Sequence, residues 1–137
     1  MILADTNVLS QPLRLNGEPK VIAWIDAHSD ELYIPVHAIS ELVYGIELVE
    51  DWDRKIRLTN ALAALRLRFE DRYVPFDTAA ADAHGWLQAR MHRSGGKLPE
   101  IDSQIAAIAI SRGATIATRN TKDFARAGVE LIDPWSD

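Results

Sequence analysis

Several features are absent from this 137-residue chain, and each absence narrows what it can be. It contains no cysteine, which excludes disulfides, thiolate metal sites and cysteine nucleophiles. No apolar run approaches the length of a membrane span, and the short apolar start lacks a basic leader, so we expect no signal peptide and a cytoplasmic location. The chain also lacks an excess of basic residues, which a protein that binds nucleic acid by bulk charge would carry.

The residues that are present describe an ordinary globular domain. Hydrophobic residues make up 47% of the chain, enough for a real core, and the length suits one domain over residues 1–137. The net charge is −5 at pH 7. An acidic protein can still act on nucleic acid if a bound metal neutralises the phosphate locally.

Short apolar segments alternate with amphipathic ones along the chain. We predict strands at 1–4, 32–36, 72–76, 115–118 and 129–132, and helices after Asp5, from Pro19, over 39–46, 54–69 and 77–93, and from Pro99 to Gly113. Alternation of this kind favours a mostly parallel sheet covered on both faces. The sequence therefore predicts one α/β domain of three-layer α/β/α form with about five strands.

The predicted helices carry apolar stripes that should face the core. Spacing of i, i+3, i+4 and i+7 places several residues of the third, fourth and last of these helices inward. The predicted inward residues are Ile39, Leu42, Val43 and Ile46; Ile56, Leu58, Leu62, Leu65 and Phe69; and Ile101, Ile105 and Ile108.

Four carboxylates stand where strands or helices are predicted to end or begin. Asp5 follows the first strand, Glu41 lies early in the helix after the second strand, and Asp102 lies in a first helical turn. Asp123 follows the fourth strand by a few residues. Ligands of open α/β sheets bind beyond the carboxyl ends of the strands, and converging carboxylates need a cation such as Mg²⁺ or Mn²⁺.

Each carboxylate also has a simpler interpretation, which the residues alone leave open. Asp5 can cap a helix N-terminus, and Asp102 can complement a helix dipole. Glu41 can be a solvated helix residue, and Asp123 can cap a short turn. The order and context of the four residues favour a common site.

Four segments, taken in order, resemble the motifs of PIN-domain ribonucleases. They are Met1-Ile2-Leu3-Ala4-Asp5-Thr6-Asn7-Val8-Leu9-Ser10, Ile39-Ser40-Glu41-Leu42-Val43-Tyr44-Gly45-Ile46, Asp102-Ser103-Gln104-Ile105-Ala106-Ala107-Ile108-Ala109, and Ala117-Thr118-Arg119-Asn120-Thr121-Lys122-Asp123-Phe124. The resemblance covers essentially the whole chain. It is nearest to the VapC toxins of bacterial toxin–antitoxin pairs, and among them to the FitB-like branch.

The resemblance implies a PIN-like fold and a Mg²⁺-dependent endoribonuclease, with Mn²⁺ as a possible substitute. Such an enzyme would hydrolyse RNA phosphodiesters with a water that the metal activates. The implied catalytic and metal-binding residues are Asp5, Glu41, Asp102 and Asp123. The family pattern also implies a cognate antitoxin as partner and a homodimer.

Further residues near the motifs are candidates for supporting roles. Thr6 can donate its hydroxyl near Asp5 or a phosphate, and Asn120 can support the site because some relatives carry their fourth acid at that position. Arg119 and Lys122 can bind RNA phosphate. Alternatively, the Thr6 hydroxyl only supports the start of a helix. Arg119 and Lys122 can equally be solvated surface charges.

Two other functions compete with a ribonuclease. A catalytically silent PIN-fold binding module would keep the fold without needing the acids. A Mg²⁺-dependent phosphatase of the haloacid-dehalogenase type needs a second Asp two residues after the first, where this chain has Asn7.

The histidines and tryptophans give weaker signals. His28, His37, His84 and His92 show no ligand spacing and no evident Ser or carboxylate partner, so we interpret them as structural or surface residues. We expect Trp24, Trp52, Trp86 and Trp135 to pack in the core or in an interface.

Overall fold

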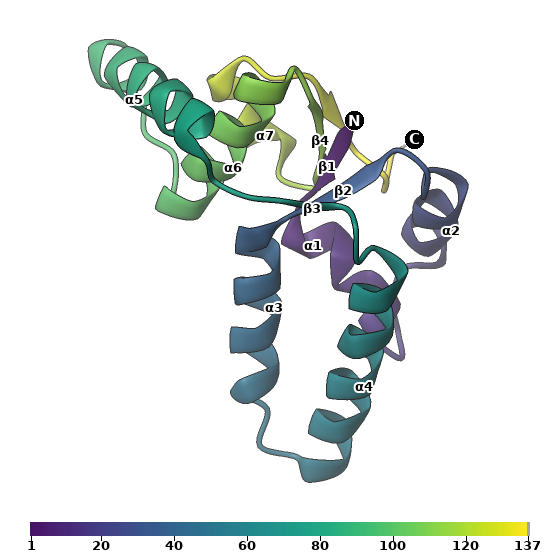
Figure 1. Ribbon diagram of the computed structural model, residues 1–137. Helices are drawn as coiled ribbons and strands as arrows, with labels where there is room; N and C mark the ends of the chain where they lie inside the picture. Colours follow the sequence, from purple (N-terminus) through teal and green to yellow (C-terminus); the bar gives the residue numbers. More distant parts are fainter. Residues whose placement is uncertain (137) are drawn as a thin grey trace.

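A parallel sheet forms the centre of the computed structural model, which describes residues 1–136 (Figure 1). Its strands are β1 (Ile2–Ala4), β2 (Leu32–Pro35), β3 (Tyr73–Val74), β4 (Thr115–Ala117) and β5 (Leu131–Ile132). They lie in the order β3-β2-β1-β4-β5, and each neighbouring pair is parallel. The predicted parallel sheet of about five strands is confirmed, although most strands are shorter than the sequence indicated.

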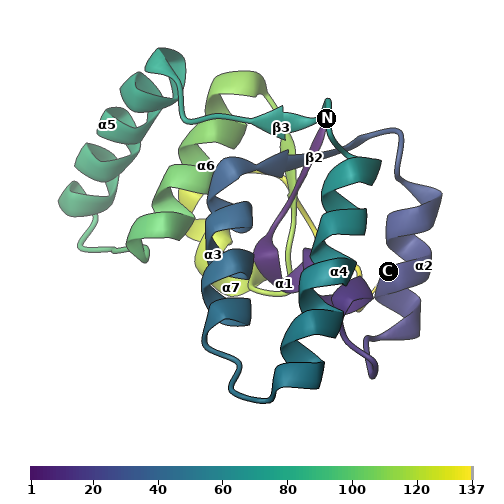
Figure 2. The ribbon, with the colours of Figure 1, turned by 60° about the horizontal axis from the view of Figure 1, so that its bottom comes forward.

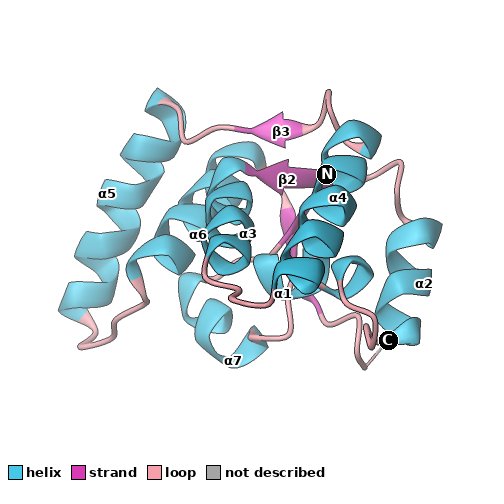
Figure 3. Cartoon of the chain, turned by 90° about the horizontal axis from the view of Figure 1, so that it is seen from below, coloured by secondary structure: helices cyan, strands magenta, loops and turns pink. Residues whose placement is uncertain are grey.

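Helices connect the strands and cover both faces of the sheet. They are α1 (Thr6–Leu9), α2 (Pro19–Ala27), α3 (Val36–Glu47), α4 (Trp52–Arg68), α5 (Thr78–Arg93), α6 (Glu100–Arg112) and α7 (Thr121–Phe124), with 3₁₀ turns η1 (Gln11–Leu13) and η2 (Ala125–Ala127). Figures 2 and 3 show α2, α3 and α4 on one side of the sheet and α5 and α6 on the other.

Side chains of successive strand residues divide the core into two layers. In β1, Ile2 and Ala4 pack with α1, α2, α3 and α4, whereas Leu3 packs with α5, α6 and α7. This alternation is the two-residue period of a strand, and it makes β1 buried on both faces. The predicted three-layer α/β/α form is therefore confirmed.

Three residues that the apolar stripes placed inward are exposed instead. Val43, Ile56 and Ile101 expose 39%, 43% and 36% of their surface. Val43 lines a depression between α3 and α4 that is open to solvent, and Ile56 lies on the surface of α4. Each helix contacts the core over a narrower face than its apolar stripe. Ile101 lies in the first turn of α6, at the end of the helix layer. The prediction was wrong for these residues because the stripes are wider than the buried faces.

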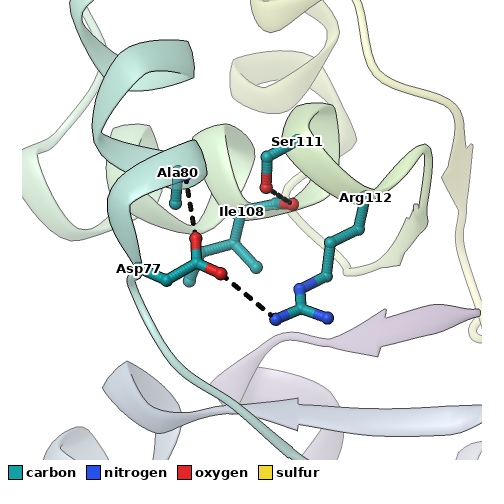
Figure 4. Close-up of polar contacts among 5 residues, drawn as sticks. All are labelled: Asp77, Ala80, Ile108, Ser111 and Arg112. Carbon is teal, nitrogen blue, oxygen red and sulfur yellow. Dashed lines mark hydrogen bonds and ion pairs between the residues drawn. The ribbon is translucent and has the colours of Figure 1, made fainter.

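Polar contacts hold the start of α5 against the end of α6. The carboxylate of Asp77 caps α5 by accepting from the Ala80 amide at 2.9 Å, and its other oxygen lies 3.5 Å from the Arg112 guanidinium (Figure 4). On the same stretch of α6, the Ser111 hydroxyl donates to the Ile108 carbonyl at 2.8 Å. The helix then ends at Gly113, whose φ of 62° suits glycine. The helix predicted over 77–93 therefore begins with Asp77 as its N-cap, and the helix predicted to end at Gly113 does so.

The tryptophans divide into two groups. Trp24 and Trp135 are partly buried and pack against the core, as predicted, whereas Trp52 and Trp86 expose 70% and 71% of their surface. The structure thus contradicts core packing for Trp52 and Trp86, which lie on helix surfaces.

Over residues 1–136, none of the helices combines the length and apolar character needed to cross a membrane.

Candidate active site

The site begins where two central strands end side by side. Ala4 of β1 pairs with Ala117 of β4, so Asp5 and Thr118 are the next neighbours along the two strands. The Asp5 amide extends this pairing by donating to the Ala117 carbonyl at 2.9 Å. Asp5 is buried, with 6% of its surface exposed, and Thr118 is fully buried. A carboxylate in such a position needs hydrogen-bond donors.

Both carboxylate oxygens of Asp5 have donors. Oδ1 accepts from the Thr6 amide at 2.8 Å, which makes Asp5 the N-cap of α1. Oδ2 accepts from the Thr118 hydroxyl at 2.8 Å and from the Asn7 side-chain amide at 3.3 Å. The capping interpretation of Asp5 is therefore correct, and it coexists with a place in the carboxylate cluster.

A network of amides and hydroxyls fixes the turn after β4. The Thr118 hydroxyl accepts from the Asn120 amide at 2.9 Å, and the Asn7 side-chain oxygen accepts from the Arg119 amide at 3.3 Å. Asn7 therefore binds both Asp5 and the turn that leads into α7. Asn7 occupies the position at which a phosphatase of the haloacid-dehalogenase type would carry its second Asp.

Thr6 connects the start of α1 to α3. Its hydroxyl donates to Oε1 of Glu41 at 2.6 Å, a short distance typical of a hydroxyl bound to a carboxylate. We expected this hydroxyl near Asp5 or a phosphate, and the structure directs it to Glu41 instead. Glu41 is partly buried, so the interpretation as a freely solvated helix residue is wrong.

Asp102, in the first turn of α6, interacts electrostatically with the other three acids of the predicted site. Burial is the main cause that raises the pKa of Asp102 to about 6, and the negative charges of Asp5, Glu41 and Asp123 raise it further. The pKa of Asp5 is also raised, chiefly by burial, although its bonds from Thr118 and Thr6 oppose the effect. These shifts indicate that the four carboxylates share one electrostatic environment.

The fourth motif contributes two polar side chains at different positions. The Asn120 side-chain amide lies 3.5 Å from Oδ2 of Asp102, while partly buried Asp123 in α7 acts on Asp102 through its charge. Arg119 directs its guanidinium over the Trp135 ring, 5.2 Å from the centroid. Lys122 is exposed beside Asp123.

The donor set suits a hard divalent cation that keeps part of its water shell. Within residues 1–136, no three Asp, Glu, His or Cys side chains lie close enough together to hold a metal ion among them. Mg²⁺ is commonly held by only one or two carboxylates together with water and phosphate oxygens, so an open site is compatible with it. Such a cation would relieve the repulsion that, in addition to burial, raises the pKa of Asp102.

Three contributors to the site were missed by sequence reasoning. Thr118 could have been found only by knowing that β1 and β4 are neighbours, because it then lies beside Asp5. His84 is the second: we saw no Ser partner for it, yet its Nε2 lies 3.1 Å from the hydroxyl oxygen of buried Ser103, next to Asp102. Asn7 is the third, and its signal was its position two residues after Asp5.

Comparison with known proteins defines the class of this fold and site. The PIN-domain family model matches residues 2–130. The chain therefore belongs to the PIN-domain family, whose ribonucleases generally depend on a divalent metal.

Individual relatives narrow the branch. The chain is 35% identical to the VapC ribonuclease Y4jK of Sinorhizobium fredii, covering 98% of both chains. It is 34% identical to the toxin FitB of Neisseria gonorrhoeae, covering 100% of both. The crystal structure of FitAcB from Neisseria gonorrhoeae superposes with a TM-score of 0.91 at 33% identity, covering 98% of this chain and 99% of that one. Within its family, the chain is a VapC-type ribonuclease of the toxin class.

Proposed function

We propose that residues 1–137 form one PIN domain that hydrolyses RNA phosphodiesters with Asp5, Glu41, Asp102 and Asp123 as its catalytic and metal-binding residues. Of this range, Asp137 lies outside the described residues. The observation that carries the proposal is that the negative charges of Asp5, Glu41 and Asp123, from separate elements, act on Asp102 and add to the effect of burial, which raises the pKa of Asp102 to about 6. Perturbed carboxylates that share a site are typical of catalytic centres.

Mg²⁺ is the proposed metal, and Mn²⁺ can take its place because both prefer oxygen ligands. When bound, the ion supplies activation of the attacking water and neutralisation of charge on the phosphate. The chain's own hydrogen bonds support the donor set. Thr118 and Thr6 hold the Asp5 carboxylate, and the Thr6 hydroxyl orients Glu41. Asn120 supports Asp102 in the same way.

The substrate RNA would meet positive charge next to the carboxylates. Arg119 is exposed on the segment that connects β4 to α7, and Lys122 is exposed in α7 itself. Arg119 is ordered over Trp135, which lowers the entropy cost of presenting its guanidinium to a phosphate. We assign both side chains to phosphate binding.

Cleavage of RNA by purified protein tests the proposal. Wild-type protein with Mg²⁺ or Mn²⁺ should cleave single-stranded RNA, and addition of a chelator should stop it. Asp5→Asn and Asp102→Asn should lower the rate by several orders of magnitude while the protein stays folded. A wild-type protein that binds RNA but never cleaves it would favour the catalytically silent binding module.

A cognate antitoxin is the proposed protein partner. We propose that the antitoxin docks in a depression of about 550 Å³ between α3 and α4, which we call the α3–α4 groove. The groove is lined by Val43, Ile46, Glu47, Thr59, Leu62, Ala63, Arg66, Leu67, Glu70 and Tyr73. This groove is larger than any other cavity described here and lies away from the catalytic carboxylates. Its mixed apolar and charged lining suits an amphipathic helix, and an Arg of the same partner could pair with the carboxylates.

We further propose a cytoplasmic homodimer as the form of the free toxin. The exposed tryptophan Trp86 on α5 and the apolar side chain of Ile110 on α6 offer surface for a second copy. Light scattering of the purified chain, with Trp86→Ser as the comparison, measures whether the dimer forms and whether this surface holds it.

A further inference from the structure

The cations of this acidic chain are distributed unevenly. Between residues 89 and 130, seven Lys and Arg residues face only four Asp and Glu residues, whereas the whole chain has 15 against 20. The seven are Arg90, Arg93, Lys97, Arg112, Arg119, Lys122 and Arg126, and the four are Glu100, Asp102, Asp123 and Glu130. The local excess is therefore positive, while the remainder of the chain repels a polyanion.

Three of these cations gather beside the loop between α5 and α6, and we call Arg93, Lys97 and Arg126 the basic rim. Arg126 from η2 reaches across to this loop, where its guanidinium lies 3.4 Å from the Lys97 carbonyl oxygen. The nearby Arg90 fixes η2 against α5 by donating to the Ala127 carbonyl at 2.6 Å. All three rim side chains are exposed.

No carboxylate neutralises the basic rim in the part of the chain that the structure describes. The ion pairs there are Lys55 with Glu47, Arg68 with Asp26, and Arg112 with Asp77. A group of exposed cations without acidic partners, in a protein of net charge −5, is a surface suited to an external anion.

A cavity of about 430 Å³ lies beside the rim, and Arg126 is the rim residue that lines it. Its lining consists of Met91, Ser94, Gly95, Gly96 and Arg126. Ser94, Gly95 and Gly96 present little side chain, and a methyl group added at Gly95 would meet no atom within 4 Å. The cavity is therefore open at Gly95, whereas the Met91 side chain lies close to Gly96, and Arg126 supplies positive charge in the lining.

The rim adjoins the proposed catalytic carboxylates along two stretches of chain. Lys97 comes just before the first turn of α6, which carries Asp102, and Arg126 follows Asp123 by three residues. Figures 2 and 3 show the α5–α6 loop and α7 at the same end of the molecule as α1. A chain of phosphates that enters the carboxylate site can thus continue over the rim.

We infer that the basic rim and its cavity form a subsite for the RNA backbone outside the scissile phosphate, a step that rests on the proposed ribonuclease function. A flexible single strand can place successive phosphates on cations from separate elements, and the open cavity accepts a base or ribose beside Arg126. An acidic protein segment is the competing ligand, but the apolar groove for a helical partner lies between α3 and α4, across the sheet from the rim.

Salt-dependent binding of a labelled single-stranded RNA, measured by fluorescence anisotropy with chelator present to prevent cleavage, tests this subsite. The double variant Lys97→Gln/Arg126→Gln should bind more weakly than wild type. Its slope of log K against log salt should be shallower by about 1.4, since each phosphate contact to a single strand contributes roughly 0.7. Lys20→Gln/Arg54→Gln removes the same charge from α2 and α4 and should leave the slope unchanged.

A second variant guards against a folding effect. The Arg93 side chain makes no hydrogen bond within the described residues, so Arg93→Gln removes a charge without removing an internal contact. This variant should make the slope of log K against log salt shallower by about half as much as the double variant does. With Mg²⁺ present, the loss of cleavage rate in both variants should grow with the length of the RNA.

The outcomes separate this inference from the function on which it rests. If wild type cleaves RNA and the rim variants match the Lys20→Gln/Arg54→Gln control, the subsite is refuted and the ribonuclease function stands. If no form of the protein cleaves RNA, both fail. If the rim variants lose only the binding of an acidic protein partner, the surface serves that partner and the RNA subsite is refuted.

Discussion

The imidazole Nε2 of His84 lies 3.1 Å from the hydroxyl oxygen of Ser103, and this contact joins α5 to the helix that carries Asp102. The Ser103 hydroxyl donates its own proton to the Glu100 carbonyl at 2.7 Å, so its oxygen accepts from Nε2–H of His84. The Phe76 ring packs edge-on between His84 and His37, with centroid distances of 5.7 Å and 6.0 Å. His37 lies one helical turn before Glu41 on α3, so the aromatic contacts connect α5 to the helix that carries a second of the proposed catalytic carboxylates.

We predict that His84 acts as a positioning residue for Asp102. His84→Phe keeps the ring contact with Phe76 but removes the donor to Ser103, and it should weaken Mn²⁺ binding by about tenfold, the lower end for residues that support metal ligands. His84→Gln can still donate and should restore most of the affinity. Titration calorimetry with Mn²⁺ measures both.

The control is His92→Phe, since His92 is an exposed histidine on the same helix. It should bind Mn²⁺ as wild type does. Equal Mn²⁺ affinity for His84→Phe and His84→Gln would show that the donor to Ser103 has no role in metal binding.

The raised pKa of Asp102 predicts a pH-dependent stability difference. Because this pKa is raised from 3.8 to about 6 in the folded protein, ionisation of Asp102 costs stability as pH rises from about 4 to 6. The shift corresponds to about 3 kcal/mol without screening, and the half-exposed carboxylate should retain about 1–2 kcal/mol of it. Metal-free Asp102→Asn should therefore be more stable than wild type at pH 7 and equally stable near pH 4.

Urea unfolding at the two pH values, with and without Mg²⁺, measures this difference. Excess Mg²⁺ should stabilise wild type more than the variant, because the ion favours the ionised carboxylate. A variant that is less stable than wild type at pH 7 would instead favour the helix-dipole interpretation of Asp102.

Thr118 should matter both for stability and for catalysis. Thr118→Val removes the donor to Asp5 and the acceptor for the Asn120 amide, both in a buried place. We expect a loss of about 1–3 kcal/mol in the free energy of unfolding, a further rise in the pKa of Asp5, and a fall in kcat. Thr59→Val, on the exposed side of α4, should cost far less. If Thr118→Val and Thr59→Val lose the same free energy of unfolding, the hydrogen bond from Thr118 to Asp5 contributes no more to stability than an exposed threonine hydroxyl does.

We predict that a substitution in the α3–α4 groove weakens antitoxin binding without affecting RNA cleavage. Leu67 lines the groove and exposes 70% of its surface, so Leu67→Glu should fold normally and keep ribonuclease activity. It should nevertheless lose at least tenfold in affinity for the co-expressed antitoxin, because a charge is buried in an apolar contact. Leu15→Glu changes a comparably exposed leucine, at 78%, outside the groove and should bind normally. Equal binding by both variants would place the antitoxin elsewhere.

The layers of the fold could be predicted from the sequence, and the acids of the site could be proposed from it, because both depend on local patterns. Alternating apolar segments gave the parallel sheet, and Asp5 and Asp102 stand in recognisable motifs. It could not reveal that Thr118 holds Asp5 or that His84 holds Ser103, since those contacts depend on strand order and on how α5 lies against α6. It also overestimated burial at Val43, because periodicity does not distinguish a core from a surface available to a partner.

The bond between Asp5 and Thr118 joins residues 113 positions apart and has a consequence for the timing of biosynthesis. The central strand β1 leaves the ribosome well before β4, its neighbour on one side. Until Thr118 emerges, Asp5 lacks its buried donor and Asp123 has not been made. A nascent chain that stops short of β4 therefore holds Asp5, Glu41 and Asp102 without the complete carboxylate set, and the proposed site assembles only after β4 has been made.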